Sequence, residues 1–178
     1  MSERIILDAG HGGRDSGASF GDRVEKEDTL AMTLEVGRIL EEQGFDVVYT
    51  REEDIYQAPF RKATIANELG GDLFVSIHRN SSGTPNQYQG VETLVYSEEG
   101  IPEEVAENIN DELEEIGYIN LGVEERPRLI VLNSTQMPAV LVEVGFINSD
   151  ADNQLFDTMF EETARAIAEG IAESFEEE

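Results

Sequence analysis

Three short apolar runs constrain the fold most strongly, because each leads to a side chain that can bind a metal or transfer a proton. The runs end at His11, His78 and Glu143. Short runs rich in Ile, Leu and Val are typical of strands that are buried on both faces of a parallel sheet. Ligand sites of open α/β sheets form outside the carboxyl ends of the strands. We therefore expect the three side chains to converge at one edge of a sheet.

The two histidines are the only ones in the chain, and they occupy equivalent positions at strand ends. His11 is surrounded by Gly10, Gly12 and Gly13, which allow the tight backbone needed to turn an imidazole toward a cleft. A single histidine at a strand end is more often a hydrogen-bonded structural residue. Two at matching positions favour a shared metal ion, and two histidines with one carboxylate form a known catalytic zinc arrangement.

Two carboxylates are candidates to complete this site. Glu25 opens the first predicted helix and is placed to reach the same cleft, and the equal alternative is a favourable charge at a helix N-terminus. Glu143 lies inside an apolar run that would bury it, and burial raises the pKa of a carboxyl group toward that of a general base. The alternative is that Arg79 or Arg61 neutralises it.

Strand and helix patterns alternate along the chain, and no repeat or low-complexity linker interrupts them. Helical spacing of apolar residues predicts helices at about 26–43, 60–69, 102–116 and 155–175. Short apolar or alternating runs predict strands at 5–7, 45–50, 73–78, 90–96, 129–132 and 139–143, of which 90–96 has the alternation of an exposed strand. The pattern predicts an α/β fold, a single domain over residues 1–178 with a mostly parallel or mixed twisted sheet and helices on both faces.

The charge balance limits the possible partners. The chain has 39 acidic and 12 basic residues and a formal net charge of −27. Such a surface repels nucleic acid, whose recognition requires clustered Lys and Arg. We interpret the acidic residues as a solvated surface, with adaptation to high salt or engineering for solubility as alternatives. The chain has no cysteine, so any metal must be held by His, Asp or Glu.

Membrane insertion is not expected, because no apolar run approaches the roughly 18 residues that span a bilayer. The first strand begins near Ile5 with no apolar segment before it, so we expect no signal peptide in this chain. The alternatives are a mature form and a protein released by a route that needs no signal.

Several ordered motifs resemble the catalytic domain of the zinc-dependent N-acetylmuramoyl-L-alanine amidases, cell-wall hydrolases of bacteria and their phages that include endolysins. The resemblance covers nearly the whole chain. The motifs are 7–13 with Asp15 and Gly17, 25–26 with Leu30, 50–51, Arg61, 66–67, 72–73, 76–78 with Asn80, 90–92 and 138–148.

By this resemblance, His11, Glu25 and His78 are the ligands of a Zn²⁺ cofactor and Glu143 is the catalytic glutamate. Glu27 is an outside alternative to Glu25. The reaction implied is hydrolysis of the amide between the lactyl group of N-acetylmuramic acid and L-alanine of the peptidoglycan stem peptide, at the cell wall and after secretion or release. The rivals are a zinc peptidase of other specificity and a non-catalytic wall-binding protein.

The residues that follow His78 are expected to contact the substrate. Arg79 and Asn80 are polar and adjacent to a ligand, so we expect them to bind the carboxylates or carbonyls of the stem peptide. The alternative for Arg79 is that it balances nearby acidic groups.

Overall fold

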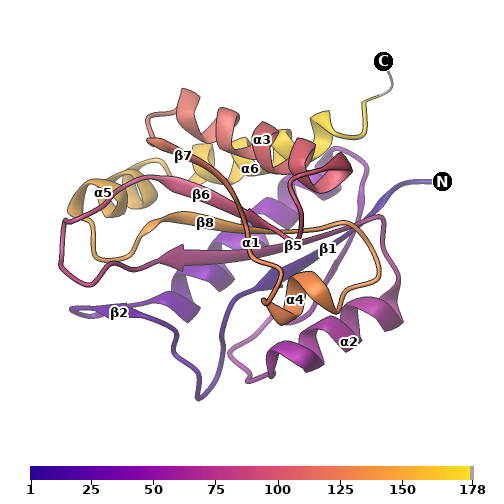
Figure 1. Cartoon of the computed structure of the whole chain (residues 1–178), viewed down its shortest axis with the longest axis horizontal. Helices are drawn as coiled ribbons and strands as arrows, with labels where there is room; N and C mark the ends of the chain where they lie inside the picture. The colour runs from indigo at the N-terminus through magenta and orange to yellow at the C-terminus, as the bar shows by residue number, and fades with distance from the viewer. Residues whose placement is uncertain (177–178) are drawn as a thin grey trace.

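The computed structural model describes residues 1–176, so the last two residues of the predicted domain lie outside it. Its centre is a six-stranded sheet with the strand order β4-β1-β5-β8-β6-β7 (Figure 1). The strands of this sheet are β1 Arg4–Ala9, β4 Asp46–Tyr49, β5 Leu73–Asn80, β6 Val91–Val95, β7 Asn120–Glu125 and β8 Ala139–Phe146. A separate two-stranded ribbon consists of β2 Ser19–Phe20 and β3 Arg23–Val24.

The sheet is mixed. Strands β4, β1, β5 and β8 run parallel to one another, β6 is antiparallel to β8, and β7 is parallel to β6. The carboxyl ends of β1, β5 and β8 therefore meet at one edge.

Helices cover both faces of this sheet (Figure 1). The helices are α1 Glu25–Glu42, α2 Pro59–Leu69, α3 Gly100–Glu115, α4 Ile130–Asn133, α5 Asp150–Thr158 and α6 Phe160–Glu173. Helices α1, α3 and α6 pack on one face over the larger apolar core, and α2 and α4 pack on the other over a smaller one. The predicted α/β class, with a mixed sheet between two helical layers, is confirmed.

The alternation of side chains along the strands decides which of them reach the site. In β8, Val140, Val142 and Val144 face the larger core under α1, α3 and α6. Leu141 belongs to the smaller core, and Glu143 shares its face of the sheet. The functional residues of the sheet therefore lie on the side covered by α2 and α4.

The strand predicted at 129–132 is wrong, because this segment forms the single helical turn α4. The backbone N–H groups of Leu132 and Asn133 donate to the carbonyl of Leu129 at 3.0 and 2.9 Å. The neighbouring strand β8 already pairs with β5 and β6, so it has no free edge for another strand. A run of four apolar residues does not distinguish a helical turn from a strand.

The closing helix predicted at 155–175 is two helices, α5 and α6. They are separated at Met159, whose φ of −121° and ψ of 38° are not helical. Helix α5 begins at Asp150, earlier than predicted, because the side chain of Ser149 caps it by accepting a hydrogen bond from the backbone N–H of Asp152. The apolar stripe predicted for this region is buried, as Ala164 and Ile167 show.

Strand β7 was not predicted. It has only two apolar side chains, Leu121 and Val123, and its other residues are polar or glycine. By pairing with β6, it moves that strand away from the sheet edge, so the run at 90–96 is mostly buried rather than exposed.

Within the described part of the chain, none of the helices combines the length and the apolar character needed to cross a membrane.

Candidate active site

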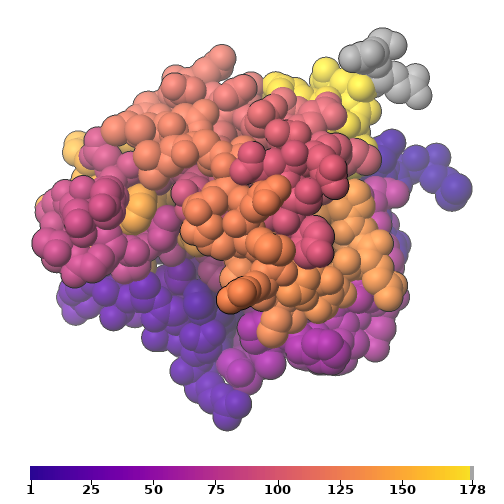
Figure 2. Space-filling model, in the orientation of Figure 1, coloured from indigo at the N-terminus to yellow at the C-terminus, as the bar shows by residue number. Residues whose placement is uncertain are grey.

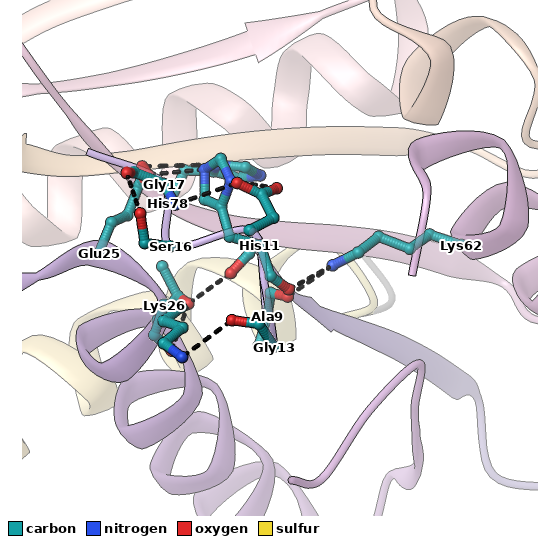
Figure 3. A network of polar contacts seen from close by, with 12 residues as sticks. Ala9, His11, Gly13, Ser16, Gly17, Glu25, Lys26, Lys62 and His78 are labelled. Carbon is teal, nitrogen blue, oxygen red and sulfur yellow. Dashed lines mark hydrogen bonds and ion pairs between the residues drawn. The ribbon is translucent and has the colours of Figure 1, made fainter. Parts of the chain in front are cut away.

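The side chains of His11, Glu25 and His78 meet at the carboxyl edge of the sheet (Figure 3). One ligand atom from each residue lies within 4.8 Å of those of the other two. His11 follows β1, His78 is in β5, and Glu25 is the first residue of α1. Glu143 in β8 is the register partner of His78, which places it on the adjacent strand. Glu27 is exposed and does not belong to this cluster.

The backbone at His11 adopts an unusual conformation that turns its imidazole into the site. Its φ of 64° lies in the left-handed region, which a residue with a side chain adopts only when its surroundings hold it there. Lys62 donates to the carbonyls of Ala9 and His11 at 2.7 and 3.3 Å. Arg51 donates to the carbonyls of Ala9 and Gly10, both at 3.0 Å. Two buried cations therefore fix the loop that carries this imidazole.

Two glycines leave the space that the cluster occupies. A Cβ atom at Gly10 would lie 2.5 Å from the ring of His78. At Gly17, a Cβ atom would lie 2.6 Å from both Glu25 Oε2 and the ring of His11. Because these approaches are impossible for real atoms, a side chain at either position would displace the cluster.

Asp15 orients the imidazole of His11, a role that the sequence did not reveal. His11 Nδ1 lies 2.8 Å from Asp15 Oδ2, and Asp15 Oδ1 accepts a hydrogen bond from the backbone N–H of Gly17. This contact directs the other ring nitrogen, Nε2, toward Glu25. A carboxylate behind the ring is the usual partner of a histidine that binds a metal. An acidic residue four positions after the histidine was the available signal.

The donor atoms fit a divalent cation. His11 Nε2 lies 2.6 Å from Glu25 Oε2, and His78 Nδ1 lies 3.8 Å from Glu25 Oε1. When Nδ1 of His11 holds a proton for Asp15, Nε2 and the carboxylate of Glu25 face each other with lone pairs, so either a proton or a metal cation must lie between them. Two imidazoles and a carboxylate form a set that binds zinc. The residues present therefore fit a zinc ion.

The ionisation of the cluster keeps Glu25 negatively charged and places positive charge on His11. Burial alone raises the pKa of Glu25, but its contacts with His11 and His78 outweigh burial and lower that pKa to about 2. Burial lowers the pKa of His11, and the neighbouring carboxylates of Glu25 and Asp15 reverse this effect and raise it. Glu25 is thus a carboxylate over the whole physiological pH range.

Glu143 has a different environment. Its side chain is partly exposed, but its Oε2 atom is buried and has no hydrogen-bond partner among the described residues. Burial raises the pKa of Glu143 to about 7; the nearby His78 opposes this rise, and Glu25 and Glu92 add to it. In residues 1–176 no Lys or Arg pairs with Glu143, so the neutralising alternative finds no support.

The sequence matches that of a known enzyme family over almost its whole length. The profile of a family described as N-acetylmuramoyl-L-alanine amidase matches residues 5–173. The chain belongs to the N-acetylmuramoyl-L-alanine amidase family. This membership confirms the resemblance seen in the motifs, and with it the predicted enzyme class, an amidase that acts on peptidoglycan.

Individual relatives agree with this membership. The endolysin of Bacillus phage SPP1 is 36% identical over 182 residues, which cover 97% of this chain and 66% of the endolysin. The sporulation-specific N-acetylmuramoyl-L-alanine amidase of Bacillus subtilis is 32% identical, with 97% of this chain and 68% of the relative covered. The chain thus spans about two thirds of the length of these two relatives.

Solved structures of the amidase family share the fold. The N-acetylmuramoyl-L-alanine amidase AmiC2 of Nostoc punctiforme superposes with a TM-score of 0.89 at 31% identity, over 96% of each chain. The catalytic domain of CwlV, an N-acetylmuramoyl-L-alanine amidase from Bacillus (Paenibacillus) polymyxa var. colistinus, gives a TM-score of 0.87 at 34% identity, over 96% of this chain and 97% of that domain.

The two residues of this amidase that were predicted to bind substrate, Arg79 and Asn80, are not part of the cluster of His11, Glu25 and His78. Arg79 is 2% exposed, and its guanidinium donates to Asp28 at 2.8 Å, to Asn153 and to two backbone carbonyls. Neighbouring residues of a strand point to opposite faces, so Arg79 points away from the face that His78 occupies. These contacts favour the alternative that it balances local acid. Asn80 accepts a hydrogen bond from the backbone N–H of Ser81, and its role toward substrate stays a prediction.

Proposed function

We propose that this chain hydrolyses the amide between the lactyl group of N-acetylmuramic acid and L-alanine of the stem peptide, with Zn²⁺ as its cofactor. The observation that carries the proposal is the meeting of His11, Glu25 and His78 at one sheet edge, beside a carboxyl group of raised pKa. We further propose that it acts at the cell wall after secretion or release. The names of its relatives, an endolysin and a sporulation-specific amidase, support this place of action.

Three side chains would hold the metal. His11 and His78 would supply ring nitrogens, and Glu25 would supply a carboxylate oxygen from the start of α1. Asp15 would keep the His11 ring oriented through its 2.8 Å contact with Nδ1. When bound, Zn²⁺ supplies Lewis-acid chemistry, since it polarises the scissile carbonyl and lowers the pKa of water.

Glu143 is proposed as the general base and acid. Its carboxylate takes a proton from the attacking water, and the protonated carboxyl then gives that proton to the departing amine of L-alanine. A base is most useful when its pKa lies near the working pH, and burial raises the pKa of Glu143 to about 7. Its buried Oε2 atom, which has no partner in residues 1–176, supports this role, because a purely structural carboxylate is expected to be hydrogen-bonded.

Product analysis on purified peptidoglycan tests this function. We expect new free amino groups on L-alanine, loss of activity after treatment with a chelator, and recovery when Zn²⁺ is restored. Elemental analysis should give about one zinc per chain, and His78→Ala should reduce it sharply. A different new amino group would identify a peptidase, and no new amine would identify a binding protein. Either result would refute the proposal.

A further inference from the structure

A cavity extends from the catalytic cluster along the face of the sheet that α2 and α4 cover. Its volume is about 290 Å³. His11 and His78 line one part of it, and Arg128 and the following residues 129–131 line another. Figure 2 shows a hollow between the indigo N-terminal segment and the orange segment that contains α4. A group bound in this cavity would therefore lie directly beside the reacting amide.

Arg128 brings an uncompensated positive charge to this cavity. Eight of the 12 basic residues form ion pairs within residues 1–176, and Arg128 forms none in that part of the chain. This is unexpected in a protein with 39 acidic residues. The other basic residue that lines the cavity, Lys62, is bonded to Asp8 at 2.9 Å and to two backbone carbonyls. Arg128 is thus the lining cation that is left to bind a ligand.

Most of the other polar groups of the lining are already hydrogen-bonded. Asp8 accepts hydrogen bonds from Thr50, Ser76 and Lys62. Gln57 donates its amide to the carbonyl of Thr50 at 2.7 Å, and its buried Oε1 atom has no partner among the described residues, so it is one free acceptor. A sugar placed here would lose water from several hydroxyl groups and find this one acceptor, which is unfavourable.

The other part of the wall is aliphatic. Leu129, Val131 and Leu141 line the cavity, and among the described residues that line it there is no Phe, Tyr or Trp. Aliphatic walls match methyl and methylene groups, while a guanidinium matches a carboxylate through two parallel hydrogen bonds. A peptide with small apolar side chains and one free carboxylate has both features.

We infer that this cavity is the subsite for the stem peptide and that Arg128 binds a carboxylate of that peptide on the alanine side of the scissile bond. This inference rests on the proposed amidase function and adds a specificity determinant to it. The enzyme then prefers stem peptides whose acidic residue after L-alanine has a free carboxylate over peptides in which that group is amidated. A neutral carboxamide pairs with a guanidinium more weakly than a carboxylate does, because the hydrogen bond loses its charge assistance.

The test uses two synthetic muramyl peptides that differ only in this group, carboxylate or carboxamide. For the zinc-loaded wild-type enzyme we expect a higher kcat/KM on the carboxylate substrate. Arg128→Gln should lower kcat/KM on that substrate by about tenfold, mainly through KM, and leave the carboxamide substrate almost unchanged. Arg128→Lys should retain part of the preference, because it keeps the charge and loses the planar fork.

Arg165→Gln is the matched control. It removes one positive charge from the exposed face of α6, which packs on the opposite side of the sheet. This variant should keep the wild-type ratio of the two substrates. An equal fall on both substrates in Arg128→Gln, or an unchanged ratio, would overturn the subsite while leaving the amidase function intact.

Peptide binding separates the subsite from the reaction. Calorimetric titration of the wild-type protein with the free stem tripeptide bearing the carboxylate requires no turnover. If Arg128→Gln binds the tripeptide about tenfold more weakly than Arg165→Gln does, the subsite is supported. This holds even if the wild type cleaves neither muramyl peptide, since the lack of cleavage would refute only the proposed function. Equal binding by the two variants overturns the subsite.

Discussion

Replacing Lys62 by Met should destabilise the amidase strongly, because it leaves a carboxylate buried without its counterion. Asp8 is fully buried and receives hydrogen bonds from Lys62, Thr50 and Ser76 at 2.9, 2.6 and 2.7 Å. Lys62 is 4% exposed, and Met retains the aliphatic part of its side chain. The substitution therefore removes the charge and creates little empty space.

The magnitude follows from the buried ion pair. Removing one partner of such a pair typically costs about 3–5 kcal/mol, since the remaining charge has lost water and gained no substitute. For a domain of this size the melting temperature should fall by about 6–20 °C. The loss also frees the carbonyls of Ala9 and His11, so zinc affinity should fall with stability.

The pH dependence gives a second, independent signature. In the wild type, burial raises the pKa of Asp8, but Lys62, Thr50 and Ser76 outweigh burial and hold that pKa below 3.8. The stability that this group contributes is present above pH 3.8 and is lost as the pH falls through its folded pKa. Without Lys62, burial should raise the folded pKa above the unfolded value. The difference in stability between wild type and variant should therefore narrow from pH 7 to pH 4.

Urea unfolding followed by circular dichroism measures these differences. The double variant Asp8→Asn with Lys62→Met has no charge left at this buried pair, so it should recover about 1–3 kcal/mol relative to the sum of the single variants. A cost below about 1 kcal/mol for Lys62→Met, or no narrowing toward pH 4, would show that Lys62 does not hold the charge of Asp8.

Three further outcomes are expected. Asp15→Asn should lower zinc affinity about 10-fold to 100-fold in competition with a chromophoric chelator, because the His11 ring loses its orienting carboxylate, and unchanged affinity would contradict this role. Glu143→Gln should lower turnover by about 10²-fold to 10⁴-fold at normal zinc content. Since Glu143 acts when deprotonated, wild-type kcat/KM should rise with pH up to about 7, and the variant should lack that rise; a variant that kept both turnover and rise would exclude Glu143 as the base. Added salt should raise the melting temperature until the Debye length falls to about 10 Å near 0.1 M, and a flat curve would mean that the acidic residues repel one another little.

The position of the site could be predicted because it depends on a general property of parallel sheets. The apolar runs before His11, His78 and Glu143 indicated buried strands, and the carboxyl ends of such strands share an edge. Glu25 comes from a helix rather than from a strand end, so the edge of the sheet does not predict its position. Its close contact with His11 depends on the loop that contains Gly17. From the sequence, a metal ligand and a favourable charge at a helix N-terminus were equal alternatives for Glu25. In the structure Glu25 begins α1 and also contacts both imidazoles.

Other features depend on contacts that are distant in sequence. Arg79 was predicted to bind substrate or to balance nearby acidic groups, and strand alternation turns it toward Asp28 in the opposite layer, which favours the second role. The direction of His78 in the strand already indicates that its neighbour points to the other face. The residue pattern does not identify strand β7 or helix α4, because the strand has few apolar residues and the helix is too short to show a period.

The buried cations of this acidic amidase support the backbone around the site. In residues 1–176 three basic residues are buried, Arg51, Lys62 and Arg79, and all donate to backbone carbonyls. Arg51 and Lys62 both bond carbonyls of the segment 9–11 that carries the His11 imidazole. Arg79 donates to the carbonyl of Val144, the residue after Glu143. Buried pairs are screened little by salt, whereas exposed charges are screened within a Debye length. The buried contacts that hold the loop at His11 should therefore depend less on salt than the exposed acidic surface does.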